Sequence, residues 1–400
     1  MQVIESPRRL ARLQEVVQKS GLDGWLLYDF RGLNPFPAQL LSLRPAMLTR
    51  RWFLFIPAHG PATLIQHRIE AANWQQLLPD PTLRHIEFST YQELDQALRQ
   101  TLAGVHRVAM EISPRGQVPY VSYVDAGTVE LVRECGVEIV SSADLLQFFA
   151  TWSAEDLQAH RVAVEGVIRA KDAGFGLIHE CLRAQQPVTE LQVQEAITHE
   201  LTRAGLEFDH PPIVAFGSHA SSGHYSVTPE TNRLLEPGMC VLIDIWAGLR
   251  DRPMADITWV GFAGEPTAEY LRVWEAVRDA RDLAIELLIH KRVTEGWQVD
   301  RAARDLITER GYGTAFRHRL GHSLGRNFPH GPSVNLDDLE THDTRTLLPG
   351  LGVTVEPGIY LGHIGVRSEV NLLITETGAQ VTTPIQTEPY RLGMDVQVGQ

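Results

Sequence analysis

The sequence predicts an α+β protein built from two domains. Its 400 residues exceed the length of one ordinary domain, and a hydrophobic fraction of 44% can fill two cores. Strands and helices alternate up to about residue 150, where a new long helix begins. We therefore expect a smaller α/β domain over residues 1–150 and a second, larger domain over residues 151–400.

In the first domain, apolar residues recur at helical spacing from Leu10 to Val17, and Gly21 ends this helix. Short β-branched and aromatic runs bounded by turn residues predict strands. The further elements expected are strands at 25–28, 52–56, 62–66, 108–111 and 137–140, and helices at 70–78, 91–98 and 121–135. No catalytic constellation occurs among these residues.

The second domain begins at Ser153, a helix N-cap that is followed by acidic residues in the first turn. Its helix continues to about residue 182, and Thr189 caps the next helix, which stops at Gly205. Beyond it we expect strands at 213–216, 241–247 and 255–260 and helices at 267–291 and 299–310.

Charge and cysteine content exclude several classes of protein. The chain has 36 basic and 49 acidic residues, a formal net charge of −13, and no basic run. Nucleic acid and anionic membrane surfaces are therefore not expected as partners. The three cysteines Cys135, Cys181 and Cys240 are widely spaced, and neither a signal peptide nor a membrane span is apparent. We expect a reduced, cytoplasmic protein.

The chemistry is concentrated in apolar segments of the second domain. His322 stands in G-H-S-L-G, Glu356 in V-E-P-G and Glu369 in V-R-S-E, while Asp244 and Asp256 lie on apolar segments upstream. Buried carboxylates are costly without a positive partner, and no lysine-rich segment supplies one. Two Asp, one His and two Glu suit two Mn²⁺, Co²⁺ or Zn²⁺ ions.

These residues and their neighbours resemble the five-ligand pattern of the pita-bread metallopeptidases, which include methionine aminopeptidase, Xaa-Pro aminopeptidase and prolidase. The resemblance covers about residues 155–385. It implies a catalytic domain of paired helices around a curved antiparallel sheet, behind a creatinase-type N-terminal domain. It also implies two divalent ions per chain, Mn²⁺ first among the candidates, held by Asp244, Asp256, His322, Glu356 and Glu369, with Asp256 and Glu369 bridging both.

Some details depart from the family pattern. Asp244 and Asp256 are 12 residues apart, one more than usual, and Trp246 stands where the family commonly has Gly. Asp251 competes with Asp256 but lies in a charged, turn-like stretch and lacks the Ile-Thr that follows Asp256. Arg367 is expected to be a charge partner of the ligands rather than a substrate contact.

The resemblance also assigns catalytic histidines that do not bind metal: His224, His318 and His330. His318 lies four residues before the ligand His322, as the family pattern requires, whereas His330 is one residue later than usual. His219 is a weaker competitor for the place of His224.

The implied reaction is hydrolysis of a short Xaa-Pro peptide by a hydroxide that bridges the two metals, with Glu356 as the general base. We expect an Xaa-Pro dipeptidase that forms a homodimer; the alternative is an Xaa-Pro aminopeptidase that acts on longer peptides. A non-catalytic pita-bread binding protein or a metal-free hydrolase is a further alternative. A familiar position for the arginine that holds the proline carboxylate is His342 here, and Arg345 matches dipeptidases and aminopeptidases alike. The residues of the first domain that could supply this charge are Arg44, Arg50 and Arg51.

Overall fold

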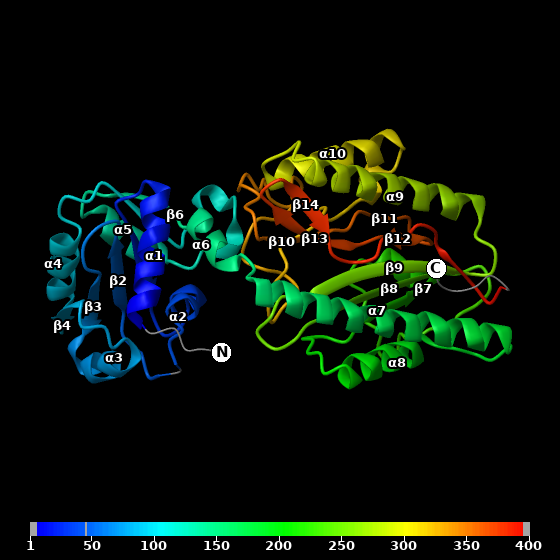
Figure 1. Cartoon of the computed structure of the whole chain (residues 1–400), viewed down its shortest axis with the longest axis horizontal. Coiled ribbons are helices and arrows are strands. Elements are labelled where there is room, and N and C mark those ends of the chain that lie inside the picture. The colour runs from blue at the N-terminus through cyan, green and yellow to red at the C-terminus, as the bar shows by residue number, and fades with distance from the viewer. Residues whose placement is uncertain (1–5, 45, 395–400) are drawn as a thin grey trace. The chain divides into compact units, whose positions relative to one another are not determined.

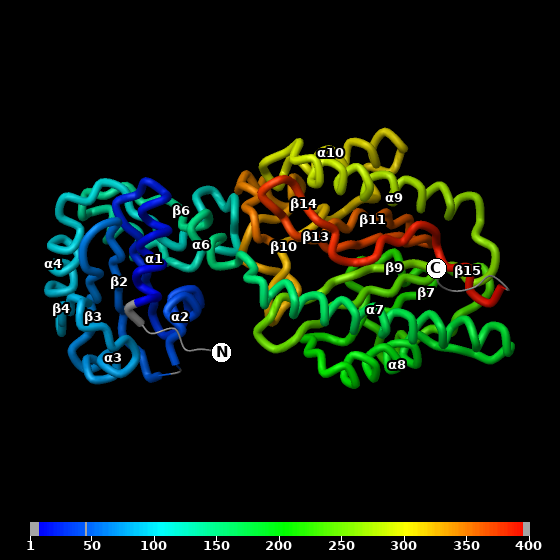
Figure 2. The backbone as a smooth tube through the Cα atoms, in the orientation of Figure 1, coloured from blue at the N-terminus to red at the C-terminus, as the bar shows by residue number. Residues whose placement is uncertain are grey.

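The structure, a computed structural model, describes residues 6–44 and 46–394. The chain divides into two compact units between residues 149 and 150. Each unit has its own sheets, helices and cores, and each is described by itself (Figures 1 and 2).

The first unit is built on one six-stranded mixed sheet in the order β4-β3-β2-β1-β5-β6. β1 pairs antiparallel with β2 and parallel with β5, so this central strand joins the two halves of the sheet. The strands are β1 (Gly24–Asp29), β2 (Trp52–Pro57), β3 (Thr63–His67), β4 (Arg84–Phe88), β5 (Arg107–Met110) and β6 (Glu138–Ser141). The helices are α1 (Ser6–Ser20), α2 (Pro35–Leu41), α3 (Ala71–Leu77), α4 (Tyr91–Thr101), α5 (Ala126–Arg133) and α6 (Ala143–Ala150).

The expected helix at 121–135 is wrong in its first third. Pro119–Val121 forms a single 3₁₀ turn, and α5 begins only at Ala126. The Asp125 side chain accepts a hydrogen bond from the backbone N–H of Thr128, which makes Asp125 the helix N-cap. Asn34 caps α2 in the same way, ahead of a proline at the first helical position. Neither α2, α6 nor β4 was expected.

The second unit contains antiparallel strands in three sheets, in the orders β15-β9-β8-β7, β10-β13-β14 and β11-β12. The one parallel pair among them is β15 with β9. The strands are β7 (Ile213–Phe216), β8 (Cys240–Ala247), β9 (Ala255–Ala263), β10 (Gly352–Val355), β11 (Gly358–Tyr360), β12 (Gly365–Arg367), β13 (Val370–Thr375), β14 (Gly378–Val381) and β15 (Tyr390–Leu392). The helices are α7 (Ala154–Arg183), α8 (Glu190–Arg203), α9 (Ala268–Ile289) and α10 (Gly296–Glu309).

Two pairs of helices cover the strands of this unit from opposite sides (Figure 1). α7 and α8 pack on β7, β8 and β9 around a core that contains Phe175 and Ile243. α9 and α10 pack on the remaining sheets around a core that contains Trp274 and Val353. α7 begins with a capping box between Ser153 and Asp156, which confirms the predicted start of this helix. The sheets between the two cores are therefore buried on both sides.

Side-chain amides complete the free edge of β9. The backbone N–H of Asp256 donates to Asn371 Oδ1 at 2.9 Å, and Asn371 Nδ2 donates to the Asp256 carbonyl at 2.5 Å. Gln386 forms the same pair of bonds with Val260, at 2.9 and 2.7 Å. The backbone N–H of Glu369 donates to the carbonyl of Thr258 between them. These bonds tie β9 to the segment that carries Glu369.

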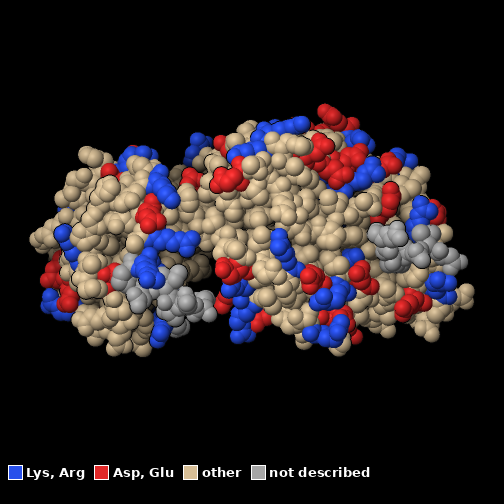
Figure 3. All heavy atoms as spheres, viewed as in Figure 1, with Lys and Arg blue, Asp and Glu red and all other residues tan. Residues whose placement is uncertain are grey.

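Acidic and basic side chains are interspersed on the face of the molecule seen in Figure 3, which shows no broad basic patch. Among the described helices, none has the length and apolar character that a membrane span requires.

Candidate metal centre

The two predicted Asp ligands lie on neighbouring strands. Asp244 of β8 is opposite Thr258 of β9, and Asp256 of β9 is opposite Trp246 of β8. Residues opposite each other or two apart share one face of a sheet, so both carboxylates point to the same side. Asp244 and Asp256 are 7% and 4% exposed, so the pair is buried.

His322 reaches the same place because its segment runs beside β10. Its backbone N–H donates to Thr354 Oγ1 at 2.9 Å, and the Thr354 N–H donates to the His322 carbonyl. The approach needs Gly321, since a Cβ there would lie 2.1 Å from the Thr354 carbonyl oxygen. The backbone N–H of Glu356 then donates to the carbonyl of Leu320.

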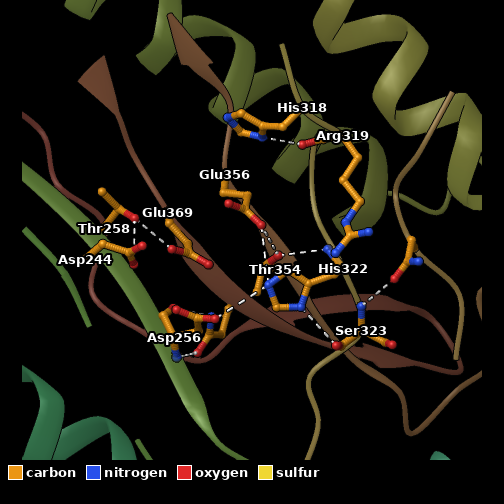
Figure 4. Close-up of polar contacts among 12 residues, drawn as sticks. Asp244, Asp256, Thr258, His318, Arg319, His322, Ser323, Thr354, Glu356 and Glu369 are labelled. Carbon is orange, nitrogen blue, oxygen red and sulfur yellow. Dashed lines mark hydrogen bonds and ion pairs between the residues drawn. The ribbon is translucent and has the colours of Figure 1, made fainter. Parts of the chain in front are cut away.

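The side chains of Asp256, His322 and Glu369 converge at one point (Figure 4). One ligand atom from each of these three residues lies within 4.8 Å of the other two. His322 Nε2 is 3.5 Å from Asp256 Oδ2 and 3.4 Å from Glu356 Oε1. The structure thus brings four carboxylates and one imidazole together at a single buried site.

Two features of this cluster fit divalent metal ions. His322 Nδ1 is 3.0 Å from the carbonyl of Ser323, which can only accept, so Nδ1 carries the proton. Burial lowers the pKa of His322, which keeps the ring neutral, and Nε2 therefore turns a lone pair toward two carboxylates. In addition, Glu369 Oε1 is buried and has no hydrogen-bond partner among the described residues. A cation between these atoms satisfies all of them.

The surrounding charges also indicate a cation. Burial and neighbouring carboxylates raise the pKa of both Asp256 and Glu369 well above the usual value. Among the described residues, the one buried cation beside them is Arg367, which donates to Asp244 Oδ2 at 2.5 Å and to Thr258 Oγ1 at 2.9 Å. Arg367 is 4.0 Å from Glu356, so it acts as a charge partner of the carboxylates. One guanidinium is not enough for four carboxylates.

His318 lies beside this cluster, and both of its ring nitrogens form hydrogen bonds. Its Nδ1–H donates to the carbonyl of Arg319 at 2.7 Å, and its Nε2 accepts from the Tyr360 hydroxyl at 2.9 Å. Burial lowers the pKa of His318 to about 3, so the ring is neutral at physiological pH. Tyr360 in turn accepts from Arg367 at 3.0 Å, which connects His318 to the charge partner of Asp244.

His224 and His330 line the same cavity, which has a volume of about 1150 Å³. The His330 ring packs edge-on against the ring of His322, with 4.3 Å between centroids. His219 is instead bound to Glu190 at 2.9 Å and does not line the cavity. The geometry therefore favours His224 over its competitor.

Three other candidates lie outside the cavity. Asp251 is an exposed turn residue with φ 57° that accepts from Asn327. Arg345 is buried in an ion pair with Asp343, and His342 contacts Asp338 at 2.7 Å. None of the three lines the cavity, so none is placed to meet a substrate there.

Several residues at this cavity were not expected from the sequence. Tyr360 lines it and contacts His318, and Arg317 and Arg319 flank His318 on the cavity wall. Thr258 does not line the cavity, but its hydroxyl contacts both Asp244 and Glu369. The flanking arginines stand in the motif F-R-H-R-L-G-H, so their proximity to His318 was visible in the sequence. Trp246 also lines the cavity, whereas in the sequence it is distinguished only as a departure from the family pattern.

Helix-flanked antiparallel sheets around a buried Asp, His and Glu cluster define a class of metal-dependent peptidases. Residues 158–376 match the sequence model of metallopeptidase family M24, which covers more than half of the chain. The chain belongs to metallopeptidase family M24, the family with the pita-bread fold.

The curated relatives are themselves described as uncharacterized peptidases. One from Staphylococcus haemolyticus is 33% identical over 198 residues, which are 49% of this chain and 53% of the relative. Another from Staphylococcus saprophyticus is 35% identical over 260 residues, 64% of this chain and 69% of the relative. The match thus spans about half the length of the first of these relatives.

Solved structures resemble the whole chain. Dipeptidase PepE from Mycobacterium ulcerans has a TM-score of 0.70 and 23% identity, with 96% of this chain and 97% of that one covered. The Pyrococcus horikoshii prolidase has a TM-score of 0.61 and 23% identity, with coverage of 96% and 100%. An X-Pro aminopeptidase from Thermotoga maritima has a TM-score of 0.60 and 22% identity, with coverage of 95% and 99%. These likenesses confirm the predicted fold class.

Proposed function

We propose that this protein is a dinuclear-metal Xaa-Pro dipeptidase. The observation that carries the proposal is the lone pair of His322 Nε2, which faces two carboxylates in the arrangement expected around a shared metal ion. In the proposal, Asp244, Asp256, His322, Glu356 and Glu369 hold two divalent ions, with Mn²⁺ preferred over Co²⁺ and Zn²⁺.

When bound, the ions supply a water of lowered pKa and positive charge for the substrate carbonyl oxygen. Glu356 is the general base: a carboxylate oxygen takes a proton from the attacking water and passes it to the proline nitrogen as the C–N bond breaks. Its Oε1 accepts from the Thr354 hydroxyl at 3.2 Å, which orients the carboxylate. His318, His330 and His224 line the cavity and position the substrate around this group.

The choice of a dipeptide rests on positive charge at the cavity wall. Arg317 is exposed, lines the cavity beside His318, and forms no ion pair with a described carboxylate. We assign it the proline carboxylate. The fold relatives named as prolidase and dipeptidase support this substrate class. The aminopeptidase alternative is favoured by His342, which stands where a familiar carboxylate-binding arginine is expected and contacts Asp338 instead. Arg345 does not decide between the two, because it matches both kinds of enzyme and is paired with Asp343.

Substrate length tests the proposal. Leu-Pro should be cleaved well, and its C-terminal amide more slowly by one to two powers of ten in kcat/KM, since a charge-assisted contact is lost. Arg317→Gln should remove most of this difference by slowing Leu-Pro alone. Equal or faster cleavage of Leu-Pro-Ala would contradict the dipeptidase assignment and favour an aminopeptidase.

Metal content separates this proposal from a non-catalytic binding protein or a metal-free hydrolase. Protein purified without chelator should contain about two ions per chain by elemental analysis, and removing them should abolish hydrolysis. Absence of metal in active protein would refute the proposal. A homodimer, also part of the proposal, is checked by sedimentation.

A further inference from the structure

The cavity is lined by an acidic side chain as well as by the arginines described above. Trp246 follows Asp244 by two residues on β8 and is the cross-strand partner of Asp256, so its indole lies on the face that carries the metal ligands. Its Nε1–H donates to Asp209 Oδ1 at 2.6 Å. Both Trp246 and Asp209 line the cavity.

The Asp209 carboxylate is fixed in place. Backbone hydrogen bonds in both directions join Glu207 to Gly248, two residues from Asp209 and Trp246 respectively, and hold the two segments together. Gln194 Nε2 donates to the carbonyl of Pro212 at 2.7 Å, which leaves its own carbonyl oxygen as a further acceptor at this wall.

The carboxylate also carries a charge that no described Lys or Arg neutralises. The Asp209 side chain is 18% exposed, and its one ionisable partner is His210, whose ring is 76% exposed. Burial opposes ionisation, but hydrogen bonds from Trp246 and His210 outweigh it and keep the pKa of Asp209 below its usual value. An indole beside a fixed carboxylate is a favourable site for an organic cation.

We propose that Asp209, oriented by Trp246, selects substrates whose N-terminal residue is lysine or arginine. The inference rests on the proposed function, in which Arg317 takes the carboxylate end of the dipeptide. A side chain fits this site better than the α-ammonium group, because the latter is bonded to the Cα next to the scissile carbonyl. The α-ammonium group must therefore stay close to the buried metal ligands, and Asp209 forms no hydrogen bond with any of these ligands. The four-carbon stem of lysine can reach outward along the indole.

The test compares Lys-Pro with norleucyl-proline, which has the carbon stem of lysine without the charge. Wild-type protein should prefer Lys-Pro, and Asp209→Asn should lower the ratio of the two kcat/KM values about tenfold, the lower end for a charge-assisted contact at a partly exposed site. Glu207→Gln is the matched control, because Glu207 pairs with Arg250 and does not line the cavity. It should leave the ratio unchanged.

Trp246→Phe keeps an aromatic ring but removes the donor to Asp209, and it should lower the ratio part of the way. An unchanged ratio in Asp209→Asn would overturn the inference, as would equal slowing of both dipeptides, which would reassign Asp209 to the α-ammonium group. Cleavage of norleucyl-proline itself tests the proposed function. If neither dipeptide is cleaved, calorimetric titration with lysinamide and norleucinamide still decides: a wild-type preference for lysinamide that Asp209→Asn removes supports the inference, and no preference refutes it.

Discussion

Glu369→Gln should change stability in opposite directions with and without metal. Glu369 is 2% exposed; its Oε2 accepts from Thr258 at 2.9 Å, and its Oε1 has no partner among the described residues. Its carboxylate shares a site within 4.8 Å with that of Asp256. At this separation and an effective dielectric constant of 20, two unit charges repel by about 3 kcal/mol. Arg367 offsets part of this repulsion.

Without metal, the neutral amide of nearly the same shape removes both the repulsion and a desolvated charge. We expect the free energy of unfolding to rise by about 1–3 kcal/mol in chelator. With Mn²⁺, wild-type protein gains about 4 kcal/mol at a metal concentration 1,000 times the dissociation constant, and the variant loses most of this gain.

Urea unfolding followed by tryptophan fluorescence, in chelator and in Mn²⁺, measures both effects. Glu376→Gln is the control, since Glu376 is an exposed residue after β13, and it should behave as wild type in both buffers. If Glu369→Gln is less stable than wild type in chelator, the reasoning is refuted, because the Glu369 carboxylate would then stabilise the fold without metal. An unchanged response to Mn²⁺ would refute it equally.

Three further predictions concern other residues. Asp256→Ala should abolish hydrolysis and most metal binding, and an active variant with two ions by elemental analysis would contradict its role as a bridge. His318→Ala should lower kcat by about 100-fold with near wild-type metal content, since its ring binds no metal; loss of an ion would make it a ligand. Asp156→Asn should cost about 2 kcal/mol in unfolding free energy at pH 7, because Arg326 and Arg252 bind the buried carboxylate. Burial raises the pKa of Asp156, but the hydrogen bonds of these arginines outweigh it, and the folded-state pKa lies far below the usual value. This stabilisation is present above the unfolded-state pKa of about 3.9 and is lost as the pH falls below it. The difference from wild type should therefore shrink in urea titrations below pH 4, and a constant difference would exclude the ion pair as its source.

Local signals in the sequence were sufficient for the four helices of the second unit and for β7, β8 and β9, but not for the short strands β10 to β15. Ser153 and Thr189 begin helices because their side chains satisfy backbone N–H groups within three residues, a relation contained in the sequence itself. In the first unit, the stretch 121–135 has helical composition, but Asp125 interrupts it as a cap. Short elements such as β4 depend on a neighbouring strand, which local patterns do not reveal.

The same distinction applies to the candidate site. The expected ligands stand in motifs, so their proximity to one another followed from the family pattern. The bond between Asp209 and Trp246 joins residues that no motif connects, and the link from His318 through Tyr360 to Arg367 depends on the pairing of β11 with β12. Such contacts are set by the tertiary fold alone.

The side-chain amide of Asn371 makes the metal centre sensitive to a slow chemical change, hydrolysis of that amide. Its nitrogen lies 2.5 Å from the carbonyl oxygen of Asp256, a residue 115 positions earlier in the chain. Hydrolysis of this amide, a common form of chemical ageing in proteins, would replace the donor by an oxygen facing another oxygen. β9 would lose this attachment at the residue proposed to bridge the ions, while its bonds to Glu369 and Gln386 would remain. The fraction of Asn371 that stays intact during storage, measured by mass spectrometry, should then fall in parallel with activity.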